Sequence, residues 1–279
     1  MKQNLTKLVE AYPLLQKPAY FAYIGVVSAR NLSRRFAMNN LGYLPKRVSD
    51  RGQDMWVINE VYNGKRKGFF VELGAADGFS DSNTFVLEKH YGWTGLLIEP
   101  NPVNYHRITN WHHRTATPVP LAVDPEPGKL EFMIDGQRSS LLVDEADNMN
   151  ERRASKLTKF REKDKVVTVE AVPLDEVFDR YKAPKDIDYF SLDVEGSETR
   201  ILRDFPFDKY RFLAMTIERP TPELNELLFA NGYHFVRNSL YDTFYVHERN
   251  PRMSSDRERV EITLHDHGVI RAEATADDR

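Results

Sequence analysis

The stretch at residues 69–78 constrains the fold of this chain more than any other part of the sequence. It begins with the apolar run Phe-Phe-Val, which is long enough for one buried parallel strand. Gly74 and Gly78 then favour a tight turn, and the segment at residues 80–82 offers polar N-caps for a helix. The order of strand, glycine turn and helix predicts an α/β unit with a ligand site at the turn.

The spacing of the glycines excludes two common nucleotide-binding loops. No Gly-Lys-Ser/Thr follows the turn, so the stretch is not a P-loop. Gly74 and Gly78 are separated by three residues, whereas the dinucleotide motif requires Gly-x-Gly-x-x-Gly. What remains is acid-x-Gly-x-x-x-Gly, in which Glu72 is the acid, Gly74 turns the chain and Gly78 lets a ligand approach the backbone.

Length and composition narrow the class of protein. A chain of 279 residues suits one large domain with extensions, and 41% hydrophobic residues are enough for a sizeable core. The net charge of -3 argues against a general nucleic-acid binder. The chain has no cysteine, which excludes a disulfide framework, a thiolate zinc site and a cysteine nucleophile, and is compatible with the cytoplasm. No segment reaches the roughly 18 apolar residues that span a bilayer.

Three regions follow from the distribution of apolar and charged residues. Residues 1–50 are predicted to form an N-terminal helical extension, which could pack on the domain or on a second copy of the chain in a homo-oligomer. Residues 51–248 carry the main domain, and residues 249–279 form a polar C-terminal tail. The charged segment at 144–165 has two interpretations, a lid insertion over the site or a solvated insertion.

Within the main domain, short apolar runs alternate with amphipathic helical patterns. Strands are expected at residues 69–73, 95–98, 119–123, 128–134, 166–172, 187–192 and 212–217. Helices are expected near residues 82–90, 103–111, 174–181 and 197–202, and after Thr221. The pattern predicts an α/β fold with a mostly parallel sheet, helices on both faces and a terminal antiparallel hairpin at residues 234–247.

Acidic residues stand at the ends of four predicted strands. They are Glu72, Glu99, Asp193 and Glu218. In an open parallel sheet, ligands bind outside the carboxyl ends of the strands. We therefore expect the four carboxylates to converge on one crevice, where each needs a cation, a hydroxyl group or a proton.

The chain resembles the FkbM family of S-adenosylmethionine-dependent methyltransferases. The resemblance is carried by the stretch at 69–78, by Ser-Asn-Thr at 82–84, by Gly-Trp-Thr-Gly-Leu-Leu-Ile-Glu-Pro-Asn at 92–101, by Ile-Asp-Tyr-Phe-Ser-Leu-Asp-Val-Glu-Gly at 187–196 and by Thr-Ile-Glu at 216–218. These stretches occur in matching order between residues 52 and 247. The resemblance implies a Rossmann-like class I methyltransferase fold and an O-methyltransferase that acts on a sugar, a glycan or a related small natural product.

The resemblance also implies a set of cofactor-binding residues. The residues that match the S-adenosylmethionine site are Glu72, Gly74, Ala76, Gly78, Ser82, Asn83, Glu99 and Asp193. Glu99 matches the acid that accepts hydrogen bonds from the ribose. Ser82 and Asn83 could hold the cofactor's carboxylate through backbone N–H groups, although simple capping explains Ser82 equally well.

The resemblance places the chemistry at Asp193 and Glu218. Metal-dependent O-methyltransferases of this fold hold Mg²⁺ at these strand ends, and carboxylate oxygens suit that ion. The family often carries His-Asn after the glutamate, but Arg219 and Pro220 follow here. This departure leaves two alternatives, a Mg²⁺ site at Asp193 and Glu218, or a metal-free site in which Arg219 pairs with Glu218 or an anionic substrate.

Other functions remain as alternatives. One is an N-methyltransferase acting on an amino sugar, and another is a non-catalytic cofactor-binding protein of the same fold. Nucleic acid is not an expected partner, because the sequence has no Asn/Asp-Pro-Pro-Tyr/Phe motif for a flipped base. The expected partner is a small-molecule or glycan acceptor.

Overall fold

The structure is a computed structural model. It describes residues 33, 46–110, 114–136, 139–143, 160–161, 163, 165–251, 261–264 and 270–273. The chain divides into two compact units, Met1–Lys46 and Arg47–Arg279. Nearly all of the predicted N-terminal helical extension lies outside the described residues, as do most of the predicted lid at 144–165 and most of the tail.

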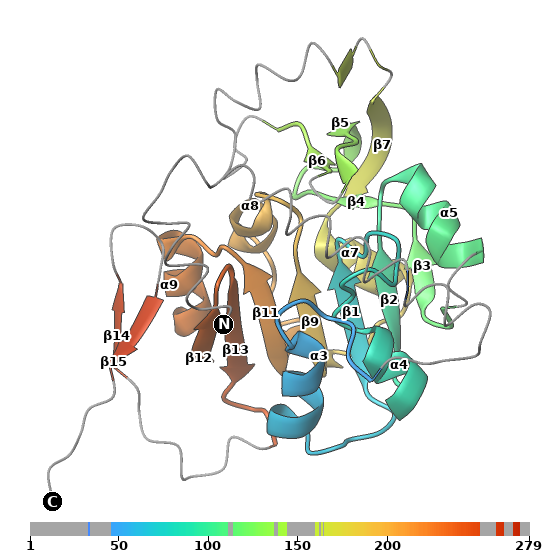
Figure 1. Cartoon of the computed structure of the whole chain (residues 1–279). Helices are drawn as coiled ribbons and strands as arrows, with labels where there is room; N and C mark the ends of the chain where they lie inside the picture. Colours follow the sequence, from blue (N-terminus) through green and yellow to red (C-terminus); the bar gives the residue numbers. More distant parts are fainter. Residues whose placement is uncertain are drawn as a thin grey trace, which may run out of the picture. The chain divides into compact units, whose positions relative to one another are not determined.

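A seven-stranded sheet forms the centre of the second unit, in the order β12-β13-β11-β9-β1-β2-β3 (Figure 1). Its strands are β1 (Phe69–Leu73), β2 (Thr94–Ile98), β3 (Thr117–Val119), β9 (Tyr189–Leu192), β11 (Ala214–Glu218), β12 (Tyr233–Ser239) and β13 (Asp242–His247). The first five pair in parallel, and β13 pairs antiparallel with both β11 and β12. The predicted fold class is therefore confirmed.

Helices cover both faces of this sheet. The helices on one face are α3 (Gln53–Met55), the π-helix η1 (Trp56–Val61), α4 (Phe85–Tyr91) and α5 (Pro102–Asn110). Those on the other face are α7 (Leu174–Arg180), α8 (Glu198–Arg203) and α9 (Pro222–Ala230). Each group packs a separate cluster of buried apolar side chains onto the sheet. The strands are thus buried on both faces, which explains their nearly continuous apolar sequences.

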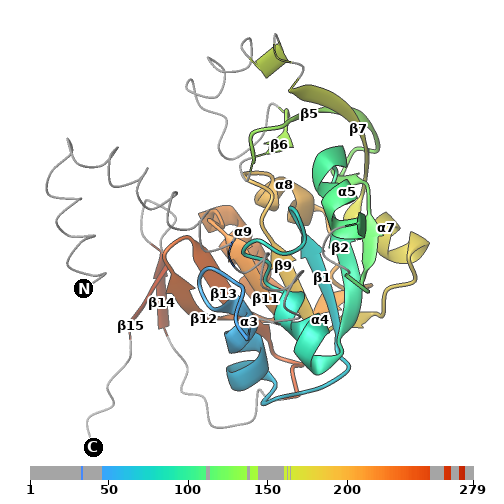
Figure 2. The same ribbon diagram turned by 45° about the vertical axis from the view of Figure 1, so that its right-hand side comes forward.

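A smaller four-stranded sheet lies beyond one end of the main sheet (Figure 2). It has the order β4-β7-β5-β6 and consists of β4 (Ala122–Val123), β5 (Gly128–Met133), β6 (Ser140–Leu141) and β7 (Val166–Val172). The single extended piece predicted at 119–123 is wrong, because Val119 ends a strand of the main sheet and Ala122 begins a strand of the smaller one. Pro120 cannot donate a ladder hydrogen bond and separates the two.

Two further pairs of short strands complete the described structure. The parallel pair is β8 (Asp186–Ile187) with β10 (Arg211–Phe212), and the antiparallel pair is β14 (Glu261–Leu264) with β15 (Ile270–Glu273). Both β14 and β15 lie within residues 249–279, the segment that the sequence describes as a polar tail. Among the helices of the described residues, none has both the length and the apolar character needed to cross a membrane.

Candidate active site

A crevice of about 570 Å³, including its open mouth, lies between the carboxyl ends of the main-sheet strands and the smaller sheet. The crevice is open to solvent, and its walls combine apolar surface with a few carboxyl groups, as small-molecule sites do. The lining residues come from both sheets and are Leu73, Gly74, Ala76, Glu99, Pro100, Asn104, Ala122, Val123, Phe132, Gly136, Ser139, Leu141, Asp193, Val194, Glu195, Ser197 and Ile201. The crevice therefore brings Gly74, Ala76, Glu99 and Asp193 together as predicted.

Glu99 follows β2 directly and presents a largely buried carboxyl group to the crevice. Its Oε1 accepts a hydrogen bond from the Asn101 N–H at 2.9 Å, and it also accepts from the Ala76 backbone and the Asn104 side chain. Burial raises the pKa of Glu99 to about 8, although these hydrogen bonds oppose the shift. The carboxyl group is thus fixed in place where it can accept hydroxyl donors from a ligand.

The two glycines of the turn are required by packing. A Cβ on Gly74 would lie 1.8 Å from the Asp193 carbonyl oxygen, and Gly74 has a φ of 86°. A Cβ on Gly78 would lie 2.9 Å from Ile108 Cγ1 of α5, and Gly78 does not line the crevice. The expectation that Gly78 admits a ligand is therefore replaced by a packing role against α5.

Glu72 lies apart from the crevice and binds the segment that precedes α4. It accepts hydrogen bonds from Ser82 Oγ at 3.0 Å, the Asn83 N–H at 2.7 Å and Thr84 Oγ1 at 2.6 Å. Burial raises its pKa, and Arg114 opposes the shift. The expectation that all four strand-end acids converge is wrong for Glu72, because its oxygens already serve this segment.

The backbone N–H of Asn83 is therefore occupied by Glu72, and neither Ser82 nor Asn83 lines the crevice. The side chain of Asn83 donates from Nδ2 to Ser191 Oγ at 2.8 Å. Its Oδ1 is buried and has no hydrogen-bond partner within the part of the chain that the structure describes. Because this oxygen is buried and Asn83 does not line the crevice, Ser82 and Asn83 support the site from behind it.

Arg114 is a buried residue that the sequence reasoning missed. Its side chain has no exposed surface and donates from Nε to Glu88 Oε2 at 2.7 Å, from Nη2 to Thr84 Oγ1 at 2.8 Å and from Nη1 to the Gly78 carbonyl at 2.5 Å. Burial opposes ionisation of Glu88, but Arg114 and the Thr115 N–H outweigh it and hold the pKa of Glu88 at about 2. No local pattern marks Arg114, because its partners are distant in sequence.

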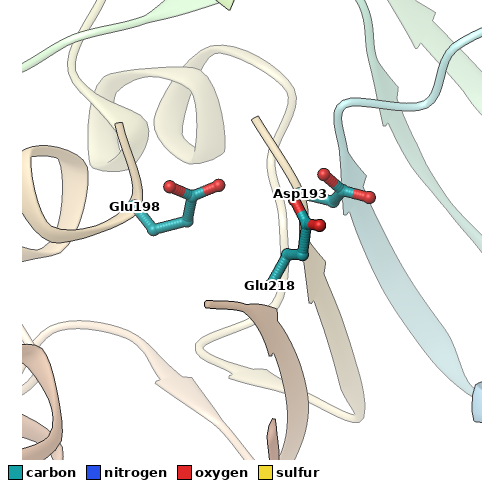
Figure 3. Close-up of side chains that lie close together, drawn as sticks. All are labelled: Asp193, Glu198 and Glu218. Carbon is teal, nitrogen blue, oxygen red and sulfur yellow. The ribbon is translucent and has the colours of Figure 1, made fainter. Parts of the chain in front are cut away.

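Three carboxylates gather at the ends of β9 and β11 (Figure 3). Asp193 follows β9, Glu218 ends β11, and Glu198 begins α8; each offers an oxygen within 4.8 Å of the others. Asp193 is exposed to solvent on one side; crowding by the surrounding protein, followed by the negative charge of Glu218, raises the pKa of its carboxyl group. The predicted pair of Asp193 and Glu218 thus lies together, with Glu198 as an additional member.

Glu198 and Arg219 define the surroundings of this pair. Glu198 accepts hydrogen bonds from the N–H groups of Val194 and Gly196 at 3.0 and 2.9 Å, so it holds the loop that follows β9. Arg219 Nη1 lies 3.1 Å from Glu218 Oε1, which is the pairing that the sequence suggested as one alternative. A positive charge therefore already accompanies Glu218.

The main sheet has the strand order of a class I S-adenosylmethionine-dependent methyltransferase. It carries a glycine turn after β1, an acid after β2 and acids at the ends of β9 and β11, which is the pattern of that class. The sequence matches the model of the methyltransferase FkbM domain over residues 72–240. The chain belongs to the FkbM methyltransferase family, as the sequence predicted. No curated protein matches the chain.

Several solved methyltransferase structures resemble the fold at low sequence identity. The N-terminal domain of human METTL16 in complex with SAH has a TM-score of 0.40 and 12% identity, covering 79% of this chain and 80% of that chain. A human methyltransferase 10 domain containing protein has a TM-score of 0.38 and 12% identity, covering 78% and 93%. The precorrin-6y C5,15-methyltransferase from Geobacter metallireducens GS-15 has a TM-score of 0.35 and 10% identity, covering 73% and 92%.

Proposed function

We propose that the protein is an O-methyltransferase that acts on a hydroxyl group of a sugar, a glycan or a related small natural product. The observation that carries the proposal is the crevice that joins Glu99 to Asp193, with Glu218 beside Asp193. Glu99 offers an acceptor suited to ribose hydroxyls, and the other two carboxylates can receive a proton from an acceptor hydroxyl.

The residues of the crevice fit the cofactor. S-adenosylmethionine supplies an electrophilic methyl group on a sulfonium when it is bound. Glu99 would hold the ribose, and the backbone at Gly74 and Ala76 would shape the floor beneath the cofactor. Glu72 and Ser82 would support the site through Asn83 and Thr84.

Asp193 and Glu218 would remove the proton from the acceptor hydroxyl group. Two carboxylates this close cannot both ionise easily, so one of them carries a proton or faces a cation. Without a metal, Arg219 forms an ion pair with Glu218, and Asp193 is the carboxylate that acts as the general base. The raised pKa of Asp193 gives a base of useful strength once it has lost its proton.

A Mg²⁺ ion is the second possibility for the same carboxylates. Asp193, Glu198 and Glu218 could each offer one oxygen, and Mg²⁺ prefers oxygen ligands. Glu198 already accepts two backbone hydrogen bonds and Glu218 already pairs with Arg219, so these contacts would compete with the ion. We therefore rank the metal-free site first.

The experiment is methyl transfer by the purified protein to a panel of saccharides. Asp193→Asn should reduce transfer at least 100-fold, as loss of a general base typically does, while the affinity for S-adenosylhomocysteine stays close to that of the wild type. Activity that EDTA abolishes and Mg²⁺ restores would support the metal, whereas activity indifferent to EDTA supports the Arg219 site. Full turnover in both Asp193→Asn and Glu218→Gln would contradict the proposal.

An amino group is the alternative acceptor. The acidic surroundings of Asp193 would attract a cationic amino sugar as well as accept hydroxyl donors. Mass spectrometry of the product separates the two functions, because acid hydrolysis followed by derivatisation distinguishes an N-methyl from an O-methyl group.

A further inference from the structure

The tip of the β12–β13 hairpin lies beside the acidic end of β11. Glu218, the last residue of β11, is opposite Asp242, the first residue of β13. The Arg219 N–H donates to the Tyr241 carbonyl at 2.7 Å, which fixes the tip against the chain that leaves β11. Leu240 and Tyr241, which connect the two strands, therefore border the site at Asp193 and Glu218.

Leu240 occupies a position that the fold alone would give to glycine. Its φ is 63°, in the left-handed region, where a branched apolar side chain is strained. Its side chain is 63% exposed, so no burial offsets this strain. A hairpin connection of this kind favours glycine, asparagine or aspartate. Nothing in the packing of the described residues explains leucine here, whereas contact with a ligand does.

Tyr241 presents an aromatic surface at the same place. Its side chain is 49% exposed, and the Arg219 guanidinium carbon lies 4.3 Å from its ring centroid. Arg219 also lies 3.1 Å from Glu218. We call Leu240, Tyr241 and Arg219 the rim shelf. Through Arg219, it links an exposed apolar surface to the Glu218 carboxylate at the end of β11.

The charges around the rim shelf indicate which ligands it accepts. Asp193 is surrounded by four other acids, Glu195, Glu198, Glu218 and Asp242. Glu218 also acts on Asp242, so this end of the crevice is strongly negative. Arg219 offsets one of these charges. An anionic ligand would be repelled from this end of the crevice, whereas neutral hydroxyl groups can donate to the carboxylates.

We propose that the rim shelf binds the acceptor and that this acceptor is a neutral pyranose, with its apolar ring face on Tyr241 and Leu240 and its hydroxyl groups toward Glu218. The inference rests on the proposed function, since it names the substrate class of that same site. Aromatic rings offer a flat apolar surface to the C–H groups of a sugar, and the adjacent acids supply the polar partners.

The test uses the full chain saturated with S-adenosylhomocysteine and a series of methyl pyranosides. The neutral members are the methyl glycosides of glucose, galactose, mannose and rhamnose, and the anionic members are the matching uronates and 6-phosphates. Saturation-transfer NMR should detect binding of at least one neutral glycoside, with its anionic counterpart bound at least tenfold more weakly. An anionic member that binds equally well overturns the assignment of a neutral acceptor.

Four variants separate recognition from folding. Tyr241→Ala and Leu240→Gly should weaken glycoside binding at least tenfold, whereas Tyr241→Phe and the exposed control Val103→Ala should keep it. All four should retain S-adenosylhomocysteine affinity, and Leu240→Gly should raise the melting temperature because it removes the strain. If Tyr241→Ala and Leu240→Gly both leave glycoside binding unchanged, the rim shelf does not bind the acceptor.

The outcome of methyl transfer distinguishes this inference from the proposed function. If the wild-type protein methylates a saccharide and the shelf variants methylate it equally well, the proposed function is supported and the role of the rim shelf in acceptor binding is contradicted. If no saccharide in the panel is methylated or bound, both fall. Sedimentation of Leu240→Gly adds a last arm: a wild-type oligomer that dissociates in this variant would assign the tip to an interface between copies and overturn its role in acceptor binding.

Discussion

At the scale of single residues, we expect Glu99 to make cofactor binding sensitive to pH. Burial raises its pKa to about 8, so below that pH the free protein holds a neutral carboxylic acid. Ribose hydroxyls are bound better by the ionised acceptor, so binding must release a proton below pH 8. We expect affinity for S-adenosylhomocysteine to rise from about pH 6 to about pH 8 and then to level off.

Calorimetry across that pH range checks this expectation. Glu99→Gln serves as the control, because an amide cannot titrate: its affinity should be lower by about 1–3 kcal/mol above pH 8 and independent of pH. A wild-type affinity that stays constant from pH 6 to pH 9 would show that Glu99 does not contact the cofactor.

Gly74 offers a second residue-scale prediction, in which strain and collision can be separated. Gly74→Ala places a methyl group 1.8 Å from the Asp193 carbonyl oxygen, so the ends of β1 and β9 must move apart. Gly64 has a similar φ of 80° but no atom within 4 Å of its Cβ position, so Gly64→Ala reports strain alone. We expect urea unfolding to show a loss of about 1 kcal/mol for Gly64→Ala and a much larger loss for Gly74→Ala. Equal losses would rule out the collision.

The positions of two site residues, Glu99 and Asp193, could be predicted from the sequence because parallel register aligns them. Leu73 pairs with Ile98 and with Leu192, so the residues that follow these partners, Glu99 and Asp193, reach the same edge of the sheet. Glu72 precedes Leu73 and pairs with residues inside β2 and β9. In the sequence, Glu72 stands near the end of the apolar run. In the sheet it lies one residue before the edge, so its side chain is buried against the segment that precedes α4.

At the scale of elements, one arginine with a buried side chain holds the glycine turn after β1 to α4. Arg114 joins Glu88 of α4 to the Gly78 carbonyl and to Thr84. Arg114→Met would keep most of the volume but remove the cation at Glu88 Oε2, so that this buried carboxylate keeps only one cation, Lys89, at its Oε1. The change should lower the free energy of unfolding by about 3–5 kcal/mol. Urea unfolding measures this loss, and calorimetry should show weaker S-adenosylhomocysteine binding because the Gly78 end of the loop is released.

Arg180 provides the matched control for Arg114. It pairs with Glu176 and Glu170 on the surface, where its side chain is exposed to solvent. Because water screens such pairs, Arg180→Met should leave both unfolding and cofactor binding unchanged within error. If Arg114→Met behaves like Arg180→Met, the buried network does not stabilise the loop.

Elements with local signals were predicted well, and those that depend on distant partners were not. Helix α9 begins where Thr221 and Pro222 indicated, and Thr221 Oγ1 accepts from the Leu224 N–H at 3.1 Å. The split between β3 and β4 could not be predicted, because an apolar run does not specify which sheet it joins. The same reason hides the contribution of Phe132 and Leu141 to the crevice.

At the scale of the whole second unit, the crevice depends on two sheets that share little backbone pairing. Gly74, Glu99 and Asp193 belong to the main sheet, whereas Phe132 of β5 and Leu141 of β6 belong to the smaller one. The apolar cluster of the main sheet includes Val123 of β4 and Val172 of β7, whereas Phe132 and Leu141 pack in a separate, smaller cluster. The base of the smaller sheet is also anchored by Arg200 of α8, which pairs with the buried Asp124 after β4. A ligand that contacts both walls would therefore add a connection at the outer strands β5 and β6.

This arrangement predicts which strands cofactor binding will protect from hydrogen exchange. At 100 times its dissociation constant, S-adenosylhomocysteine adds about 2.7 kcal/mol to the stability of the bound form, and the gain is expected where the ligand joins the sheets. Hydrogen exchange should slow most in β5 and β6, whose local stability is lower than that of the central strands. The hairpin β12–β13 supplies none of the lining residues and should exchange at the same rate with and without the ligand. Slowing in β12–β13 equal to that in β5 and β6 would indicate a general stabilisation of the fold, and would contradict the smaller sheet as a wall of the cofactor site.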